Sequence, residues 1–260
     1  HTQAPEPMPE YITLVTRGRI ADALTSADGA AFVRDVLPSY LVKRRWFSAK
    51  DQNIKSTRIR YLAPLPDGER EIILAEIETR AEGETNRWQL PLSVIWDDEP
   101  GASLPSQLAL ARVRRGRRTG LLTDAFTLPG FARRMLGALA DASRVETADG
   151  QIVFDPIDKD ETMLRQPENA PVLWLTAEQS NSSLIVNDAV MLKIFRKVSP
   201  GMHPEAEISR HLTAQGFVNT PPMFGEIVRT AKDGERSSLA VAQGFVRNQG
   251  DAWTWTLDQF

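Results

Sequence analysis

Cysteine is absent from the 260-residue chain, and histidine occurs only at positions 1, 203 and 211. A chain without cysteine has no disulfide, no thiolate nucleophile and no zinc–thiolate site. Three scattered histidines also exclude a His-rich metal centre. No apolar run approaches the roughly 20 residues that a membrane-spanning helix needs, and the polar, proline-rich N-terminus is unlike a secretory signal. We therefore expect a cytoplasmic protein without a membrane partner.

The chain also has no excess of basic residues over acidic ones. Lys and Arg number 31 and Asp and Glu number 34, so the formal net charge is −3. We therefore expect no nucleic-acid partner. Hydrophobic residues make up 42% of the chain and charged residues 25%, which is ordinary for a globular protein with a real core. The length suits one large domain or two small ones.

The N-terminal part of the chain predicts a helix packed on an antiparallel sheet. Prolines make residues 1–27 an extended linker, and apolar spacing predicts a helix over 30–41 that ends or kinks at Pro38. Three segments with strand-like patterns follow, separated by turn-forming residues, at 56–62, 71–78 and 87–95. This α+β unit occupies residues 28–98. An acidic stretch with proline and glycine at 97–101 is its predicted boundary.

Residues 102–247 predict a second α+β unit. Apolar runs and alternation predict strands at 108–113, 151–154, 173–175, 184–186, 189–195, 224–229 and 239–245. Amphipathic spacing predicts helices over 128–141 and 204–215. Asn187 and Asp188 suit a tight turn between two of the strands, because both residue types tolerate positive φ.

Two basic stretches stand out in this acidic chain. Lys43–Phe47 combines three basic residues with two aromatic ones, and Arg112–Arg118 contains five arginines. A basic run beside aromatics can contact nucleic acid, and an arginine cluster can contact phosphate or a partner. The net negative charge favours a structural corner for the first stretch and a solvated hairpin tip for the second. The nearby tryptophans could stack on sugar, but core packing is the favoured interpretation.

Lys193 is the most informative charged residue. In the strand 189–195, alternation puts Lys193 on the same face as three apolar side chains. A buried ammonium is costly unless it is paired, and the following helix supplies Glu205 and Glu207 as candidate partners. With a polar strand–loop–strand before it, such a lysine is typical of kinases, where it holds nucleotide phosphates. A lysine that reaches out to water is the alternative.

Three segments of the second unit together resemble bacterial maltokinases: Ala177–Ser183, Met191–Arg196 and Gly201–Ile208. Those enzymes are similar to aminoglycoside phosphotransferases and, more distantly, to eukaryotic-type protein kinases. Residues 37–50 resemble the family's N-terminal cap subdomain, and residues 112–125 fit its intermediate region. The resemblance covers residues 11–260. It implies a cystatin-like cap followed by an intermediate subdomain and a protein-kinase-like N-lobe with an antiparallel sheet.

The resemblance also implies the chemistry. ATP with Mg²⁺ would phosphorylate maltose to maltose 1-phosphate. Lys193 would hold the nucleotide phosphates and Glu207 would position the lysine, although helical geometry favours Glu205. In place of a Gly-x-Gly-x-x-Gly motif, the loop over the phosphates would consist of Gln179, Ser180, Asn181, Ser182 and Ser183. Backbone groups of the hinge would bind the adenine edge, at Gly244, Phe245 and Val246.

The family occurs both alone and fused behind trehalose synthase, the isomerase that interconverts maltose and trehalose. The proline-rich start, which lacks an initiator methionine, resembles such a junction, so we expect a preceding trehalose synthase domain. Residues 248–260 resemble the hinge and the first helix of the large lobe, or C-lobe. No segment matches that lobe's catalytic Asp or Mg²⁺ ligands. We therefore expect the C-lobe to be missing and this chain alone to be inactive.

Two other functions stay open. The chain could be a non-catalytic docking or regulatory module of a trehalose synthase. It could also belong to a kinase-like phosphotransferase that acts on another small hydroxylated substrate.

Overall fold

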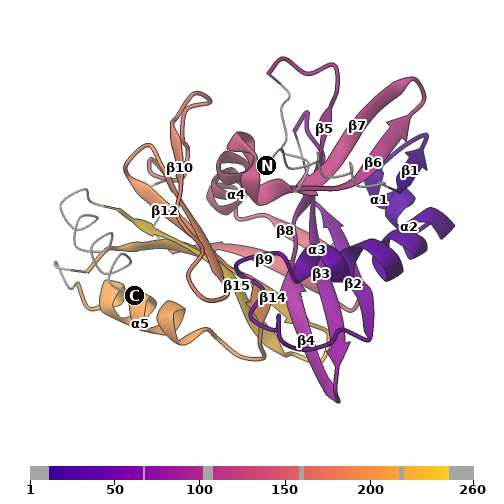
Figure 1. Cartoon of the computed structure of the whole chain (residues 1–260). Coiled ribbons are helices and arrows are strands. Elements are labelled where there is room, and N and C mark those ends of the chain that lie inside the picture. Colours follow the sequence, from indigo (N-terminus) through magenta and orange to yellow (C-terminus); the bar gives the residue numbers. More distant parts are fainter. Residues whose placement is uncertain (1–11, 67, 102–107, 158–160, 217–219, 246–260) are drawn as a thin grey trace, which may run out of the picture.

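The computed structural model describes residues 12–66, 68–101, 108–157, 161–216 and 220–245. These residues form two sheets whose strands pair antiparallel, apart from one parallel pair, with helices packed against them (Figure 1). The α+β class expected from the sequence is confirmed. Within the described ranges, no helix is long and apolar enough to cross a bilayer.

The first sheet draws on the N-terminal half of the chain and on one short strand from the C-terminal half. Its strand order is β1 (Thr13–Thr16), β6 (Ala109–Arg115), β7 (Arg118–Asp124), β5 (Leu92–Trp96), β3 (Ile72–Ala81), β4 (Glu84–Gln89) and β13 (Lys197–Val198), with β2 (Ser56–Pro64) paired to β3. The parallel pair is β1 with β6. Arg112–Arg118 forms the β6–β7 hairpin, as predicted.

A helical run covers the outer face of the first sheet. It comprises α1 (Ile20–Leu24), α2 (Ala27–Ala31), the π-helical turn η1 (Phe32–Val36) and α3 (Leu37–Leu41). The kink expected near Pro38 takes the form of the π-helical turn, in which the Leu37 N–H donates to the Phe32 carbonyl five residues back. Pro38 is the second residue of α3 and has no N–H to donate to a carbonyl of the preceding turn.

Aromatic side chains fill the core between this helical run and the first sheet. The Trp88 ring is fully buried, with its centroid 4.5 Å from that of Phe47 and 6.3 Å from that of Trp46. The Trp88 Nε1–H donates to Thr79 Oγ1 at 2.9 Å, so its polar edge is satisfied. Core packing, and not a sugar platform, is therefore the role of these rings.

The second sheet comes from the C-terminal half. Its strand order is β10 (Val172–Trp174), β11 (Asn181–Val186), β12 (Val190–Phe195), β15 (Arg236–Gly244), β14 (Met223–Ala231), β9 (Gly150–Pro156) and β8 (Arg144–Thr147). Asn187 and Asp188 join β11 to β12 with φ of 54° and 50°, as their residue types predict. Helix α5 (Pro204–Ala214) lies along the face of this sheet that is turned away from the first sheet (Figure 1).

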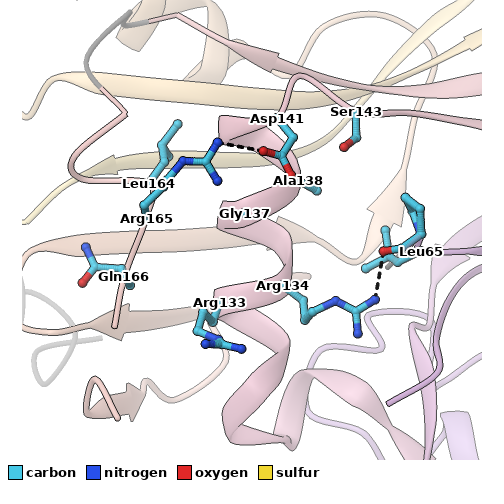
Figure 2. Close-up of a pocket in the computed structure, with 11 residues that line it drawn as sticks. Leu65, Arg133, Arg134, Gly137, Ala138, Asp141, Ser143, Leu164, Arg165 and Gln166 are labelled. Carbon is cyan, nitrogen blue, oxygen red and sulfur yellow. Dashed lines mark hydrogen bonds and ion pairs between the residues drawn. The ribbon is translucent and has the colours of Figure 1, made fainter. Parts of the chain in front are cut away.

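Helix α4 (Pro129–Ala140) lies beside both sheets, and arginine contacts hold its middle and its C-terminal end. Arg165 pairs with Asp141 at 2.7 Å (Figure 2). Arg134 donates to the Arg70 carbonyl at 2.8 Å. These arginines line a pocket of about 260 Å³. The protein itself engages the Arg134 and Arg165 guanidinium groups, whereas Arg133, which also lines this pocket, is exposed.

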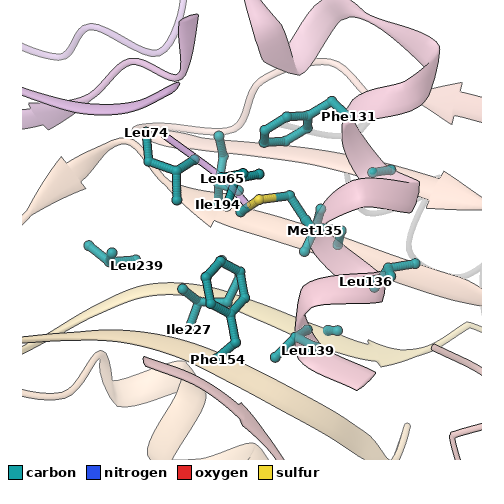
Figure 3. Packing of buried hydrophobic residues seen from close by; sticks show 14 of the residues in the cluster. Leu65, Leu74, Phe131, Met135, Leu136, Leu139, Phe154, Ile194, Ile227 and Leu239 are labelled. Carbon is teal, nitrogen blue, oxygen red and sulfur yellow. The ribbon is translucent and has the colours of Figure 1, made fainter. Parts of the chain in front are cut away.

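The main core lies where α4 meets the inner faces of the two sheets. Phe131 and Met135 of α4 pack against Leu74 of the first sheet and against Phe154 and Ile227 of the second (Figure 3). The apolar stripe of α4 is the amphipathic pattern that predicted this helix. The two sheets therefore share one hydrophobic core.

Buried polar contacts also join the sheets, and they centre on Arg196, which is 1% exposed. Its guanidinium donates to Asp124 Oδ2 at 2.7 Å, to Ser182 Oγ at 2.8 Å and to the Gln89 carbonyl at 3.3 Å. The Gln89 amide in turn donates to the carbonyls of Phe195 and Leu239, each at 2.7 Å. Directly after Arg196 the chain leaves the second sheet, and β13 pairs with β4 of the first sheet.

Three details differ from the sequence-based boundaries. The strand expected over 87–95 is two strands, β4 and β5, with Pro91 between them, because proline cannot donate to a sheet ladder. The boundary expected at 97–101 falls within one sheet, since β5 pairs with β7. The expected linker 1–27 includes β1 and α1. Residues 1–11 and 248–260 lie outside the described residues.

Candidate functional site

Lys193 lies on β12 in the middle of the second sheet, and its side chain is only 8% exposed. Leu192 and Ile194 face the main core, whereas Phe195 faces α5. Alternation along the strand therefore puts Lys193 on the α5 side. Its ammonium donates to Glu205 Oε1 at 2.5 Å. Lys193 is thus a buried lysine paired with a helix carboxylate, and not one that reaches out to water.

The partner of Lys193 is Glu205, which corrects the preference for Glu207. Glu205 is the second residue of α5, and its side chain is 34% exposed beside the sheet. Glu207 is exposed. Residues two apart on an α-helix point in nearly opposite directions, because each residue turns the helix by about 100°. The rotation of α5 on the sheet therefore selects Glu205.

His203 fixes the start of α5 and thereby the position of Glu205. Its Nδ1 accepts a hydrogen bond from the Glu205 N–H at 3.2 Å, the contact of an N-cap residue. Its ring stacks on Phe195, with centroids 3.9 Å apart and planes 3° from parallel. Burial lowers the pKa of His203 below its ordinary value, the nearby Glu205 acts in the opposite direction, and Lys193 lowers it further.

The predicted phosphate loop forms the tip of the β10–β11 hairpin. Glu178 and Asn181 exchange backbone hydrogen bonds of 3.2 and 2.9 Å, which leaves Gln179 and Ser180 at the tip. Gln179 has φ of 52°, a left-handed conformation. A short polar hairpin therefore stands where the sequence predicted a covering loop.

The two serines after the tip lie on opposite faces of the sheet. Ser183 is directly opposite Lys193 in the β11–β12 register and so shares its face. Ser182 is buried on the other face, where its hydroxyl accepts the hydrogen bond from Arg196. The structure therefore brings Ser183 to the lysine and directs the Ser182 side chain away from it.

A cavity of about 400 Å³ opens beside the paired carboxylate. Its lining combines the start of α5 with the end of β15 and consists of His203, Pro204, Glu205, Ile208, Ser209, Thr220, Pro221 and Gln243. Gln243 directly precedes the predicted hinge. The cavity therefore extends from Glu205 toward the hinge, and Lys193 is not among the residues that line it.

Two of the three predicted hinge residues use their N–H groups within the fold. The Gly244 N–H donates to the Pro222 carbonyl and the Phe245 N–H to the Ala189 carbonyl, each at 2.8 Å. A side chain at Gly244 would approach the Pro222 ring to 2.9 Å, so this close contact requires glycine. Val246 lies outside the described residues. The N–H groups of Gly244 and Phe245 are therefore not free for adenine.

Metal ligands do not gather in the described part of the chain. No group of three or more His, Asp or Glu side chains there is placed to hold a metal ion. We therefore assign no Mg²⁺ ligand to these residues.

Sequence reasoning missed Arg196 and its carboxylate partner Asp124. One signal was available, because alternation puts Arg196 on the same face as the apolar Leu192 and Ile194. A charge at such a position indicates a buried pair, but the sequence does not show with which residue.

Comparison with known protein families identifies the first sheet. Residues 40–127 match the family model of the maltokinase N-terminal cap domain. This segment spans β2 to β7 and therefore most of the first sheet. Residues 40–127 are thus similar to a maltokinase N-terminal cap domain, and the match extends past the boundary that the sequence predicted near residue 98.

The chain also resembles individual proteins, among them glucosamine kinases. The chain is 26% identical over 83 residues to the glucosamine kinase of Mycolicibacterium smegmatis (strain ATCC 700084 / mc(2)155), a match that covers 32% of this chain and 21% of that protein. Two crystal forms of a glucosamine kinase, A and B, match with a TM-score of 0.48 and 16% identity. They cover 83% of this chain and 41% and 40% of theirs. The chain therefore spans about two fifths of the solved relatives.

Proposed function

We propose that this chain is the N-terminal part of a maltokinase-type phosphotransferase, which uses ATP and Mg²⁺ to convert maltose to maltose 1-phosphate. One observation carries the proposal. The buried Lys193 is paired with Glu205 beneath a polar hairpin and beside an open cavity. In kinases, a strand lysine held by a helix carboxylate contacts nucleotide phosphates.

The residues around the pair fit a nucleotide. The Lys193 ammonium would contact the phosphates, and Glu205 would hold it in place. The tip at Gln179 and Ser180 would cover the phosphates, with Asn181 and Ser183 beside it and Ser182 contributing only its backbone. The adenine edge would meet carbonyls of the hinge and the N–H of Val246. Glu207 would have no direct role.

Phosphoryl transfer is proposed for the whole protein. The chain spans about two fifths of the solved glucosamine kinases, and no Mg²⁺ ligand is assigned among the described residues. When bound, Mg²⁺ would neutralise charge that develops on the phosphates. We further propose that the large lobe supplies its ligands and that a trehalose synthase domain precedes the cap. On this proposal, the property to test in this chain is nucleotide binding.

The sugar substrate is a separate question, and one observation favours a second candidate. One curated relative is a glucosamine kinase, so an amino sugar is the alternative to maltose. Initial rates of the whole protein on maltose, glucosamine and glucose would separate the two. A rate with glucosamine above that with maltose would contradict the maltose proposal but leave the nucleotide site intact.

Calorimetric titration of the chain with ATP and Mg²⁺ tests the nucleotide site. We expect Lys193→Ala and Glu205→Ala each to weaken binding by about tenfold or more, because a hydrogen bond between charged groups contributes about 1.5–3 kcal/mol. Glu207→Ala is the matched control on the same helix and should leave the affinity within about twofold. Circular dichroism would establish that each variant is folded.

Two results would contradict the proposal. One is no ATP binding by a well-folded chain, which would favour a docking or regulatory module instead. The other is an affinity that Lys193→Ala and Glu205→Ala leave unchanged.

A further inference from the structure

A second, larger cavity lies on the opposite side of the β10–β11 hairpin from Lys193, where the cap domain meets the second sheet. Its volume is about 520 Å³, within the range of small-molecule sites. The walls come from the Lys43–Trp46 corner, from the ends of the first sheet and from the hairpin, and they include Asp124, Trp174 and Arg196. We call it the inter-sheet cavity.

The inter-sheet cavity is strongly cationic in an acidic protein. Four basic side chains line it, against the single carboxylate of Asp124. That carboxylate is already neutralised by Arg196 at the floor, at 2.7 Å. Lys43 and Arg45 are exposed at the rim, and neither has an ion-pair partner among the residues that the structure describes. A positive charge without a counter-ion attracts anions, and low-dielectric walls strengthen the attraction.

The floor of the cavity is rigid, as a binding site requires. The Arg196 guanidinium makes hydrogen bonds to three residues and lies 4.5 Å from the centroid of the Trp46 ring. It needs no ligand for its own stability. Asp124 balances its charge, so the positive field of the cavity comes from the other basic side chains, and Arg196 holds the floor without rearrangement when a ligand binds.

One wall presents an aromatic side chain that is both fixed and accessible. The Trp174 Nε1–H donates to the Phe126 carbonyl at 2.7 Å, which holds the indole in place. The residue is nevertheless 37% exposed. An indole held by its polar edge offers its apolar surface to a ring, either a sugar or a base.

We propose that the inter-sheet cavity binds a small phosphorylated molecule. Its phosphate would lie between Lys43 and Arg45, and its sugar or nucleoside part would contact Trp174. Phosphate suits this rim because a dianion can be shared by two cationic side chains. This site goes beyond the proposed nucleotide site, because it uses no residue of the Lys193–Glu205 pair and lies on the other face of the sheet.

Calorimetry with three phosphate probes and one neutral probe tests the site. The probes are inorganic phosphate, glucose 1-phosphate and AMP, with glucose as the neutral compound. We expect at least one phosphate probe to bind, glucose not to bind, and the affinity to fall as salt is added. The phosphate probe that binds most tightly identifies the source of the ligand: free phosphate, a phosphorylated sugar or a nucleotide.

Three variants locate the binding. The double variant Lys43→Ala with Arg45→Ala should lower the affinity for the phosphate probe by about tenfold or more, because two charge-assisted contacts are lost. Arg114→Ala with Arg117→Ala is the matched control, since both arginines are exposed and neither lines the cavity. That control should change the affinity less than about twofold. Lys193→Ala should retain binding, which separates this site from the nucleotide site.

Three outcomes would overturn the proposal. No phosphate probe binds to the folded chain, the Lys43/Arg45 double variant binds as tightly as the unmodified chain, or the Arg114/Arg117 control loses as much affinity as the rim variant.

Discussion

At the start of α5, His203 caps the helix and stacks on the sheet. Its Nδ1 can accept the Glu205 N–H only while that nitrogen is unprotonated. The same side chain thus links the geometry of Glu205 to pH. Because Glu205 holds Lys193, the candidate nucleotide site depends on a neutral imidazole.

We expect the chain to lose stability as the pH falls through the ordinary histidine range. Burial lowers the pKa of His203 from 6.5 in the folded state, so the unfolded chain binds this proton first. The neutral imidazole contributes fully to the free energy of unfolding above the pKa that His203 has in the unfolded chain. This contribution declines as the pH falls toward the lower pKa of His203 in the folded chain. Urea unfolding from about pH 7.5 to 5 measures this slope.

His203→Asn is the control for this prediction, because asparagine also caps helices but does not titrate. The variant should show a shallower loss of unfolding free energy between the same pH limits. A slope equal to that of the unmodified chain would mean that other groups cause the pH dependence.

At the scale of elements, single glycines decide whether strands and helices pack. Gly120 lies in β7, where a side-chain carbon would come 2.5 Å from the Ile95 carbonyl and 2.8 Å from Val94 Cγ1. Gly137 lies within α4, and an added carbon there meets nothing within 4 Å. The same substitution therefore has opposite consequences in the two elements.

We expect Gly120→Ala to lower the free energy of unfolding by about 1–3 kcal/mol, because the strand must move to relieve the clash. Gly137→Ala should raise it by up to about 1 kcal/mol, because alanine favours a helix. Denaturant midpoints of the two variants test both signs. Destabilisation by both, or by neither, would contradict the packing described for β7 and α4.

At the scale of the whole molecule, two sheets act as one body because apolar and polar contacts cross between them. The α4 core supplies the apolar part (Figure 3). Arg196 and Gln89 supply the polar part, and β13 joins the sheets through the backbone. The cap is thereby attached to the same strand that carries Lys193, three residues before Arg196.

We expect Arg196→Ala to lower the free energy of unfolding by about 3–5 kcal/mol, because it leaves the buried Asp124 charge unpaired. Arg118→Ala is the control, since its pair with Asp98 is exposed and should contribute less than about 1 kcal/mol. Urea unfolding measures both.

The double variant Arg196→Ala with Asp124→Ala should lose less free energy of unfolding than the two single variants added together, because neither buried charge is then left without its partner. Additive costs, or an Arg196→Ala effect as small as that of Arg118→Ala, would contradict a buried coupling between the sheets.

Elements with strong local patterns were predictable, and short ones were not. The strands around Asn187 and Asp188 and the helix α4 follow from apolar alternation, helical spacing and turn chemistry. Strands β1, β8 and β13 were missed, because four, four and two residues are too few to show a period. The seven-residue strand β7 was missed as well. Residues 97–101 have the composition of a boundary but form a connection within one sheet, and composition alone cannot distinguish the two.

Only part of the candidate site could be predicted from the sequence. Alternation alone indicated that Lys193 is buried beside apolar residues. It could not identify Glu205 as the partner, because the rotation of α5 depends on how His203 and Phe195 pack. Nor could it assign Ser182 to Arg196 and Ser183 to the lysine face, because register belongs to the pair of strands.

The sequence by itself determined the absence of disulfides, the α+β class, the main elements and a buried lysine that needs a partner. These properties rest on residue types and on neighbours within a few positions. Only the tertiary structure decided that Glu205 pairs with Lys193 and that one sheet spans the expected boundary. It alone brought Arg196 to Asp124 and created the inter-sheet cavity. The contact between Arg196 and Asp124 joins residues 72 positions apart, and such pairs form only when the whole chain packs.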